Sequence, residues 1–241
     1  MKSSPRRFVL EAEFDRFAAE YREQHAASIR LSGETPDYFA EYKIRDVAET
    51  FDARREAPRR ILDFGGGVGN SLPFMRHDFP KAEVTLLDPS AASLDIAAKR
   101  FPGEATFQHF DGARLPFEAG AFDLVFTACV FHHIPAAEHV ALLREIARVL
   151  SPDGRFFLFE HNPLNPLTLH AVNSCAFDEN AVLIGARAMR RRFAAAGFGK
   201  GRTRFRIFFP HALSGLRPLE RYLAWLPLGA QYSIEAVKPR A

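Results

Sequence analysis

One stretch constrains the fold more than any other: the apolar run 61–64 leads directly into glycines at 65, 67 and 69. Glycine lets a chain turn sharply and lets a ligand approach the backbone, because no Cβ stands in the way. Asn70 is a candidate N-cap, and a helix starting there would present free N–H groups to the same ligand. The stretch therefore predicts a strand, a tight ligand-binding turn and a helix in succession.

From residue 59 onward, short apolar runs alternate with helical patterns. The runs are 60–63, 84–88, 106–107, 122–126 and 155–159. This rhythm is typical of a parallel sheet with crossover helices. The first and fourth runs are almost continuously apolar, which predicts strands covered on both faces at the sheet centre.

The pattern changes after residue 200, where apolar and polar side chains alternate with period two over 204–209 and again over 232–236. Such alternation is typical of antiparallel strands near an edge. We therefore expect an α/β fold with a doubly wound, mostly parallel seven-stranded sheet, a terminal antiparallel pair, and an insertion at 211–230. The sheet-forming domain is expected to span 56–241.

Residues 1–55 precede the sheet and are expected to form an N-terminal helical cap. Leu10, Phe14, Phe17 and Tyr21 fall on one helical face, and a loop is expected near 32–36. Two interpretations remain open. The apolar face covers the edge of the sheet, or the cap acts as a lid over a ligand.

The bulk properties are those of an ordinary globular protein, with 47% hydrophobic and 25% charged residues in 241. The start of the chain has no apolar core of a secretory signal, and no apolar stretch is long enough to span a bilayer. Cys129 and Cys175 are far apart, so the sequence indicates neither a disulfide framework nor a metal site, and a cytoplasmic location is expected. The net charge of +3 only mildly favours an anionic acceptor or membrane surface.

The glycine turn differs from a dinucleotide fingerprint, whose third glycine would stand where Asn70 is. Asp63 at the strand end would repel a pyrophosphate but suits a cation, and S-adenosylmethionine has an ammonium and a sulfonium but no phosphate. Asp88 ends the next strand, where it could accept hydrogen bonds from ribose hydroxyls, and Asp111 follows the third, where it could receive an adenine amino group. These acids favour S-adenosylmethionine over a nicotinamide cofactor.

The chain resembles the class I S-adenosylmethionine-dependent methyltransferases, in the branch similar to ubiquinone and menaquinone biosynthesis methyltransferases. The matching stretches are 14–21, 63–69, Asp88, 111–117, 122–125, 131–135 and 148–154. The resemblance implies that Asp63, Gly65 and Gly67 line the methionine portion and Asp88 the ribose. It also implies that Asp111 and Gly112 contact the adenine, that Tyr21 closes over the cofactor, and that Cys129 contacts the cofactor through its backbone.

Methyl transfer is an in-line displacement, so the protein must mainly orient the acceptor and exclude water, and a base is needed only where the acceptor loses a proton. His132 and His133 follow the fourth strand at the ligand-binding edge and are the candidate catalytic residues. One of them could instead only pack or cap. Glu160 and His161 at the end of the fifth strand are second candidates.

The acceptor is expected to be small and apolar or lipid-like, because the insertion concentrates large apolar side chains. They are Leu213, Leu216, Leu219, Leu223, Trp225, Leu226 and Leu228. The insertion could cover the acceptor, touch a membrane or form a homodimer contact. The rival hypotheses are an RNA or protein methyltransferase on the same fold, a non-catalytic cofactor-binding subunit, and a nucleotide-dependent oxidoreductase. No basic stripe interleaved with aromatic residues marks a nucleic-acid track.

Overall fold

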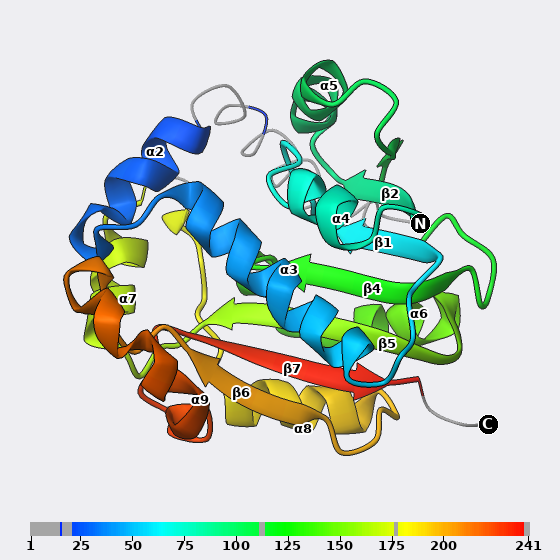
Figure 1. Cartoon of the computed structure of the whole chain (residues 1–241). Coiled ribbons are helices and arrows are strands. Elements are labelled where there is room, and N and C mark those ends of the chain that lie inside the picture. The colour runs from blue at the N-terminus through cyan, green and yellow to red at the C-terminus, as the bar shows by residue number, and fades with distance from the viewer. Residues whose placement is uncertain (1–14, 16–20, 111–113, 176–177, 239–241) are drawn as a thin grey trace.

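The computed structural model describes residue 15 and residues 21–110, 114–175 and 178–238. Seven strands form one sheet in the order β3-β2-β1-β4-β5-β7-β6 (Figure 1). Their bounds are β1 Arg60–Phe64, β2 Glu83–Asp88, β3 Thr106–His109, β4 Phe122–Ala128, β5 Leu150–His161, β6 Arg202–Arg206 and β7 Gln231–Val237. Strands β1 to β5 pair in parallel, and β7 runs antiparallel to both β5 and β6. The expected fold class is confirmed, with β1 and β4 at the centre.

Helices cover both faces of the sheet. They are α2 Tyr21–Ser28, α3 Pro36–Asp52, α4 Leu72–Asp78, α5 Ala91–Arg100, α6 His139–Val149, α7 Pro166–Asn173, α8 Ala186–Ala195 and α9 Glu220–Leu223, with shorter turns η1 Arg30–Ser32, η2 Phe131–His133 and η4 His211–Leu219. Successive residues of β1 point to opposite faces, so Ile61 packs with α3 and α4 while Leu62 packs with α6 and α8. Figure 1 shows α3 crossing one face, with α6 and α8 on the other.

The carboxyl ends of the parallel strands meet at the end of the molecule where α2 and α7 lie (Figure 1). The register of the sheet brings this about, because β5 pairs with β4 up to Phe159 beside Ala128, and His161 lies beside Gln231 at the start of β7. The side chains that follow β1, β2, β4 and β5 therefore gather at one edge. This edge is where doubly wound sheets bind their ligands.

The helical cap is described from α2 onward, with residue 15 before it. The expected loop near 32–36 is present: Gly33 has φ +72° and Thr35 caps α3, its hydroxyl accepting the Tyr38 N–H at 3.3 Å. Leu10, Phe14 and Phe17 lie outside the described residues, and of Tyr21 only the backbone is described. Whether residues 1–55 act as a lid stays a prediction.

Three boundaries differ from the expectation. Helix α4 begins at Leu72 with Ser71 as its N-cap, so the predicted cap at Asn70 is wrong; the Asn70 side chain instead accepts a hydrogen bond from Arg100. Strand β6 ends at Arg206 because Ile207 has a left-handed φ of +63°, which an extended strand cannot contain. Strand β5 begins at Leu150 instead of 155, and residues 151–154 lie at an irregularity in its pairing with β4.

Candidate functional site

The loop after β1 is shaped by its glycines. Gly65, Gly67 and Gly69 have φ of +74°, +53° and +78°, a region that side chains disfavour. A Cβ on Gly65 would lie 2.4 Å from a methyl carbon of Val130, so this glycine is needed for the loop to pack against the segment after β4. A Cβ on Gly67 would meet none of the described residues within 4 Å. The backbone at Gly67 thus faces open space where a ligand can approach.

Asp88 at the end of β2 organises that loop. One carboxylate oxygen accepts the Gly67 N–H at 2.8 Å and the other accepts the Ser90 N–H at 2.8 Å. Burial raises the pKa of Asp88 to about 6, although both backbone N–H groups oppose the shift. Ser90 is also the N-cap of α5, its hydroxyl accepting the Ser93 N–H at 3.0 Å.

Asp63 is the site's unsatisfied group. Its side chain is only 3% exposed, and its Oδ2 makes no hydrogen bond to any of the described residues. Burial raises its pKa to about 7, and the negative charge of Asp88 adds to the increase. A buried carboxylate without a partner is costly unless a cation or a donor compensates it.

These observations test whether the site suits S-adenosylmethionine. Two buried carboxylates, one of them lacking a partner beside an open glycine backbone, match a cationic ligand without phosphate and oppose a pyrophosphate. Asp63, Gly65, Gly67 and Asp88 therefore lie together as predicted. Asp111 and Gly112 lie outside the described residues.

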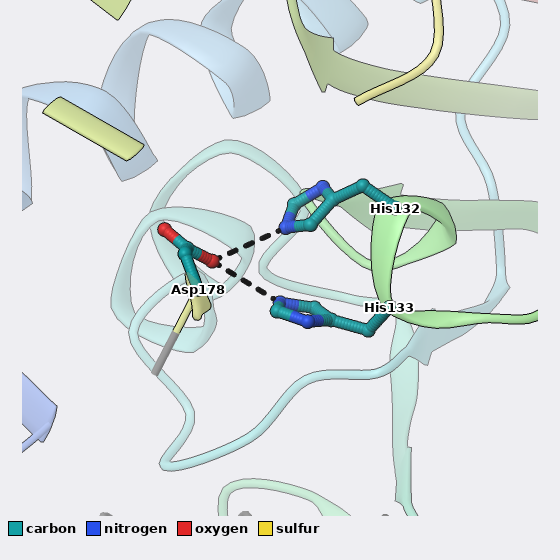
Figure 2. A group of neighbouring side chains, drawn as sticks. All are labelled: His132, His133 and Asp178. Atoms are coloured by element: carbon teal, nitrogen blue, oxygen red, sulfur yellow. Dashed lines mark ion pairs between the residues drawn. The ribbon is translucent and has the colours of Figure 1, made fainter. Parts of the chain in front are cut away.

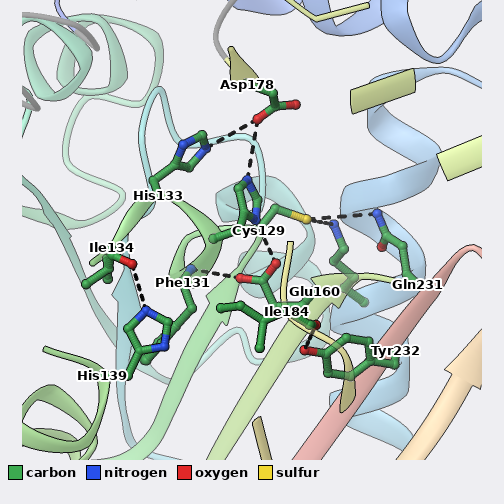
Figure 3. Close-up of polar contacts among 12 residues, drawn as sticks. Cys129, Phe131, His133, Ile134, His139, Glu160, Asp178, Ile184, Gln231 and Tyr232 are labelled. Atoms are coloured by element: carbon green, nitrogen blue, oxygen red, sulfur yellow. Dashed lines mark hydrogen bonds and ion pairs between the residues drawn. The ribbon is translucent and has the colours of Figure 1, made fainter. Parts of the chain in front are cut away.

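Cys129 begins the segment after β4 and has a left-handed φ of +59°. Its N–H donates to the Phe159 carbonyl at 2.8 Å, and its thiol lies 3.9 Å from both Lys43 Nζ and Gln231 Nε2 (Figure 3). Burial raises the pKa of this thiol. Since the Cys129 N–H is already bonded, the predicted backbone contact to a cofactor would fall to its carbonyl oxygen.

His132 and His133 lie in η2 and converge on one carboxylate, that of Asp178. Asp178 Oδ1 is 3.4 Å from His132 Nε2 and 3.3 Å from His133 Nε2 (Figure 2). Glu160 supports the pair from β5: one oxygen is 2.7 Å from His132 Nδ1 and the other accepts the Phe131 N–H at 2.8 Å. We call His132, His133, Glu160 and Asp178 the histidine–acid cluster.

The two histidines differ electrostatically. Burial lowers the pKa of His132, but the Glu160 and Asp178 carboxylates outweigh it and raise the pKa to about 10. The pKa of His133 is lowered, chiefly by burial. In the ligand-free protein His132 is therefore a cation near neutral pH, whereas His133 is neutral and able to accept a proton.

Further buried polar groups surround this cluster. Burial lowers the pKa of His161, next to Glu160, and of His25 in α2 to about 4 each. In α3, Tyr42 donates a hydrogen bond to the Gln231 side chain. Asp178, His25 and Gln231 were not predicted from the sequence. Each belongs to a different segment, and only the fold brings the three close to one another.

The comparisons with known proteins agree with this geometry. Residues 61–154 match the family described as "Methyltransferase domain". Together with the sheet order, this match shows that residues 61–154 carry a methyltransferase domain on the fold of the class I S-adenosylmethionine-dependent enzymes, whose methyl donor is S-adenosylmethionine. Its homology to the ubiquinone and menaquinone biosynthesis methyltransferases is distant.

Two relatives illustrate the distance. The chain is 36% identical over 114 residues to the demethylmenaquinone methyltransferase of Thermus thermophilus, covering 46% of this chain and 51% of that one. It is 37% identical over 118 residues to the trans-aconitate 2-methyltransferase of Methylobacterium nodulans, covering 48% and 44%. The chain thus matches about half the length of these relatives.

Solved structures share the fold over a longer span. An S-adenosylmethionine-dependent methyltransferase of Thermotoga maritima superposes with a TM-score of 0.65 at 18% identity, covering 95% of this chain and 99% of that one. The phosphoethanolamine N-methyltransferase 2 of Haemonchus contortus, solved with S-adenosyl-L-methionine, gives 0.57 at 19% identity, covering 84% and 56%.

Proposed function

We propose that this protein binds S-adenosylmethionine at the β1–β2 edge and methylates an oxygen, carbon or nitrogen atom of a small, apolar or lipid-like acceptor. The observation that carries the proposal is the buried Asp63 carboxylate, whose Oδ2 makes no hydrogen bond to the described residues and lies in the same turn region as the open backbone of Gly67. The relatives named above act on small molecules by their names.

On the donor side, Asp63 would pair with the ammonium group and Gly65 and Gly67 would admit the methionine portion. Asp88 would keep its two backbone hydrogen bonds and use its remaining lone pairs for the ribose hydroxyls. Asp111 and Gly112 would contact the adenine. Tyr21 would close over the cofactor, and Cys129 would contact it through its backbone. When bound, S-adenosylmethionine supplies a methyl group already activated by the sulfonium charge.

On the acceptor side, His132 and His133 are the proposed catalytic residues. His133, with its lowered pKa, is the group that accepts the acceptor's proton where one must leave. His132 is held by Glu160 and contributes positive charge to the same space. Both histidines follow β4, and Val130 in the same segment packs against Gly65 of the loop after β1. The groups proposed for the donor and for the acceptor therefore come from neighbouring segments at one edge of the sheet.

The acceptor's apolar character is supported by the segment between β6 and β7. Its apolar side chains remain exposed, and with the neighbouring start of α7 they form a surface that we call the apolar end face: Leu164, Leu167, Leu213, Leu216, Leu219, Trp225 and Leu228. The Asn165 side chain joins the two segments by donating to the Leu228 carbonyl at 2.9 Å. We propose that this face touches a membrane surface from which a lipid-like acceptor is taken.

None of the described helices combines the length and apolar character needed to cross a bilayer. Contact with a membrane would therefore be made by the apolar end face. Within the described residues, Cys129 and Cys175 form no disulfide, which supports the proposed cytoplasmic location.

Calorimetry tests the proposal directly. The protein should bind S-adenosylmethionine and S-adenosylhomocysteine saturably, and heat evolved only with NAD or NADP would refute it. The reaction is then followed as release of S-adenosylhomocysteine with a panel of quinone precursors and lipids as acceptors. In this assay His132→Gln and His133→Gln should each lower the rate while leaving cofactor affinity unchanged. Full activity of both variants would remove the histidines from the reaction. Turnover only with RNA or protein acceptors would favour the rival substrate classes.

A further inference from the structure

The three side chains in Figure 2 come from two distant segments and aim their ligating atoms at one point. His132 and His133 belong to η2, and Asp178 precedes α8. One nitrogen of each ring and one carboxylate oxygen all lie within 4.8 Å of one another. We propose that His132, His133 and Asp178 bind a divalent transition metal of the zinc class.

The distances fit metal ligands better than hydrogen bonds. An N–H···O hydrogen bond is usually 2.7–3.2 Å long, yet Asp178 Oδ1 is 3.4 and 3.3 Å from the two Nε2 atoms. Ligands about 2.0–2.1 Å from a tetrahedral zinc ion are separated from one another by about 3.3 Å. The two measured separations match that edge length.

His132 Nε2 provides a second, independent observation. The side chain is 1% exposed, and this nitrogen makes no hydrogen bond to any residue in the described part of the chain. Buried polar atoms are nearly always satisfied, so an unsatisfied nitrogen aimed at a carboxylate and a second imidazole indicates a missing ligand. A metal ion would satisfy it.

Glu160 completes the arrangement on the far side of His132. Histidines that ligate metals usually direct their other ring nitrogen to a carboxylate or carbonyl group, which fixes the ring and strengthens the ligand. His132 Nδ1 is 2.7 Å from Glu160, whose second oxygen is fixed by the Phe131 N–H. Glu160 is therefore a positioning residue for the metal.

Three protein ligands leave one position of a tetrahedral ion open, as in catalytic zinc sites. His133 is 12% exposed and marks the side from which an ion or ligand could enter. If the proposed methyl transfer is correct, on which this step rests, the open position would take an oxygen of the acceptor. The metal would then replace the His132 charge and the His133 base by lowering the pKa of that oxygen, because a ligating histidine is neutral and cannot accept a proton at its ligating nitrogen. The acceptor class would then be hydroxyl, enol or carboxylate compounds.

The experiment titrates Zn²⁺ into the chelator-treated full-length protein by calorimetry, and Co²⁺ by visible absorption as a readout of tetrahedral geometry. One equivalent should bind to the wild type. Asp178→Asn and His133→Gln should each weaken Zn²⁺ binding at least tenfold, and Glu160→Gln roughly 10- to 100-fold, the usual range for such partners. His77→Gln is the matched control, because it removes an exposed histidine whose ion-pair partner among the described residues is Asp78, at 2.7 Å.

No stoichiometric Zn²⁺ binding by the wild type would overturn the proposal. So would equal affinity in Asp178→Asn and wild type, or loss of binding in His77→Gln alone, which would identify an adventitious surface ion. Circular dichroism and S-adenosylmethionine titration of each variant establish that it is folded, and His133→Gln decides the matter if Asp178→Asn unfolds. Zinc binding by a wild type that fails to bind S-adenosylmethionine would refute the methyl-transfer proposal and leave the metal site standing.

Discussion

The donor and acceptor sides of this site are built differently. On the donor side, Asp63, Gly65, Gly67 and Asp88 come from two successive strand ends and the turn after the first. On the acceptor side, the histidine–acid cluster unites the segment after β4, the end of β5 and the segment before α8. A cradle made by consecutive elements can be read from a sequence, whereas a cluster made by long-range packing requires the fold.

The largest expected effect lies on the donor side, with Asp63→Asn. The pKa of Asp63 is raised from 3.8 to about 7, chiefly by burial, so its contribution to stability is full below pH 3.8 and is lost as the pH rises through about 7. Asn avoids this loss. In the ligand-free protein the gain in the free energy of unfolding should be roughly 2–3 kcal/mol larger at pH 8 than at pH 5.

Urea unfolding at the two pH values measures that gain, and calorimetry should find S-adenosylmethionine affinity reduced at least tenfold in the same variant. Asp52→Asn, at an exposed position of α3, is the control. A gain independent of pH would show that folding does not raise the pKa of Asp63 and would weaken the contrast between the two sides.

Asp88→Ala should come next. It leaves the Gly67 and Ser90 N–H groups without their acceptor and removes the proposed ribose contact. Cofactor affinity should fall by roughly 1–3 kcal/mol, measured by calorimetry against the exposed Asp95→Ala. Unchanged affinity would exclude Asp88 from the binding site.

Glu160→Gln should have a smaller effect on folding and almost none on cofactor affinity. The variant loses the charge that holds His132 but keeps an acceptor for the Phe131 N–H, so the free energy of unfolding should fall by roughly 1–2 kcal/mol. S-adenosylmethionine affinity should stay within about twofold of wild type, with exposed Glu104→Gln as the reference. A large loss of cofactor affinity would mean that the two sides are energetically one.

The smallest effect on folding is expected at the apolar end face. Trp225 is 74% exposed and Leu228 55%, so changing both to Ser should alter stability by less than about 0.5 kcal/mol. Co-sedimentation with anionic vesicles should fall several-fold relative to wild type, with neutral vesicles as the comparison. Equal co-sedimentation of the variant and the wild type would rule out the membrane contact. A dimeric wild type and a monomeric variant in sedimentation analysis would instead assign the face to a second copy of the chain.

The fold was largely predictable because apolar runs and turn residues act locally. The mostly parallel seven-stranded sheet, its central β1 and β4, and its terminal antiparallel pair all followed from short stretches of sequence. The errors arose where tertiary contacts override local preference: Asn70 contacts Arg100 instead of capping α4, and Ile207 adopts a left-handed conformation that ends β6.

The site was predictable only in part, for the same reason. The glycine turn and its flanking acids form a motif, but nothing near Asp178 in the sequence indicates that it meets two histidines far earlier in the chain. The unequal behaviour of His132 and His133 was also beyond a sequence argument, since it depends on which ring lies against Glu160.

The contact between Gly65 and Val130 has a practical consequence. A Cβ at position 65 would collide with the Val130 methyl group, so the turn that admits the cofactor and the segment that leads to the histidines fit against each other without slack. Any side chain introduced at position 65 would therefore have to displace the segment that carries both histidines, so a single substitution in the turn would alter the two parts of the site together.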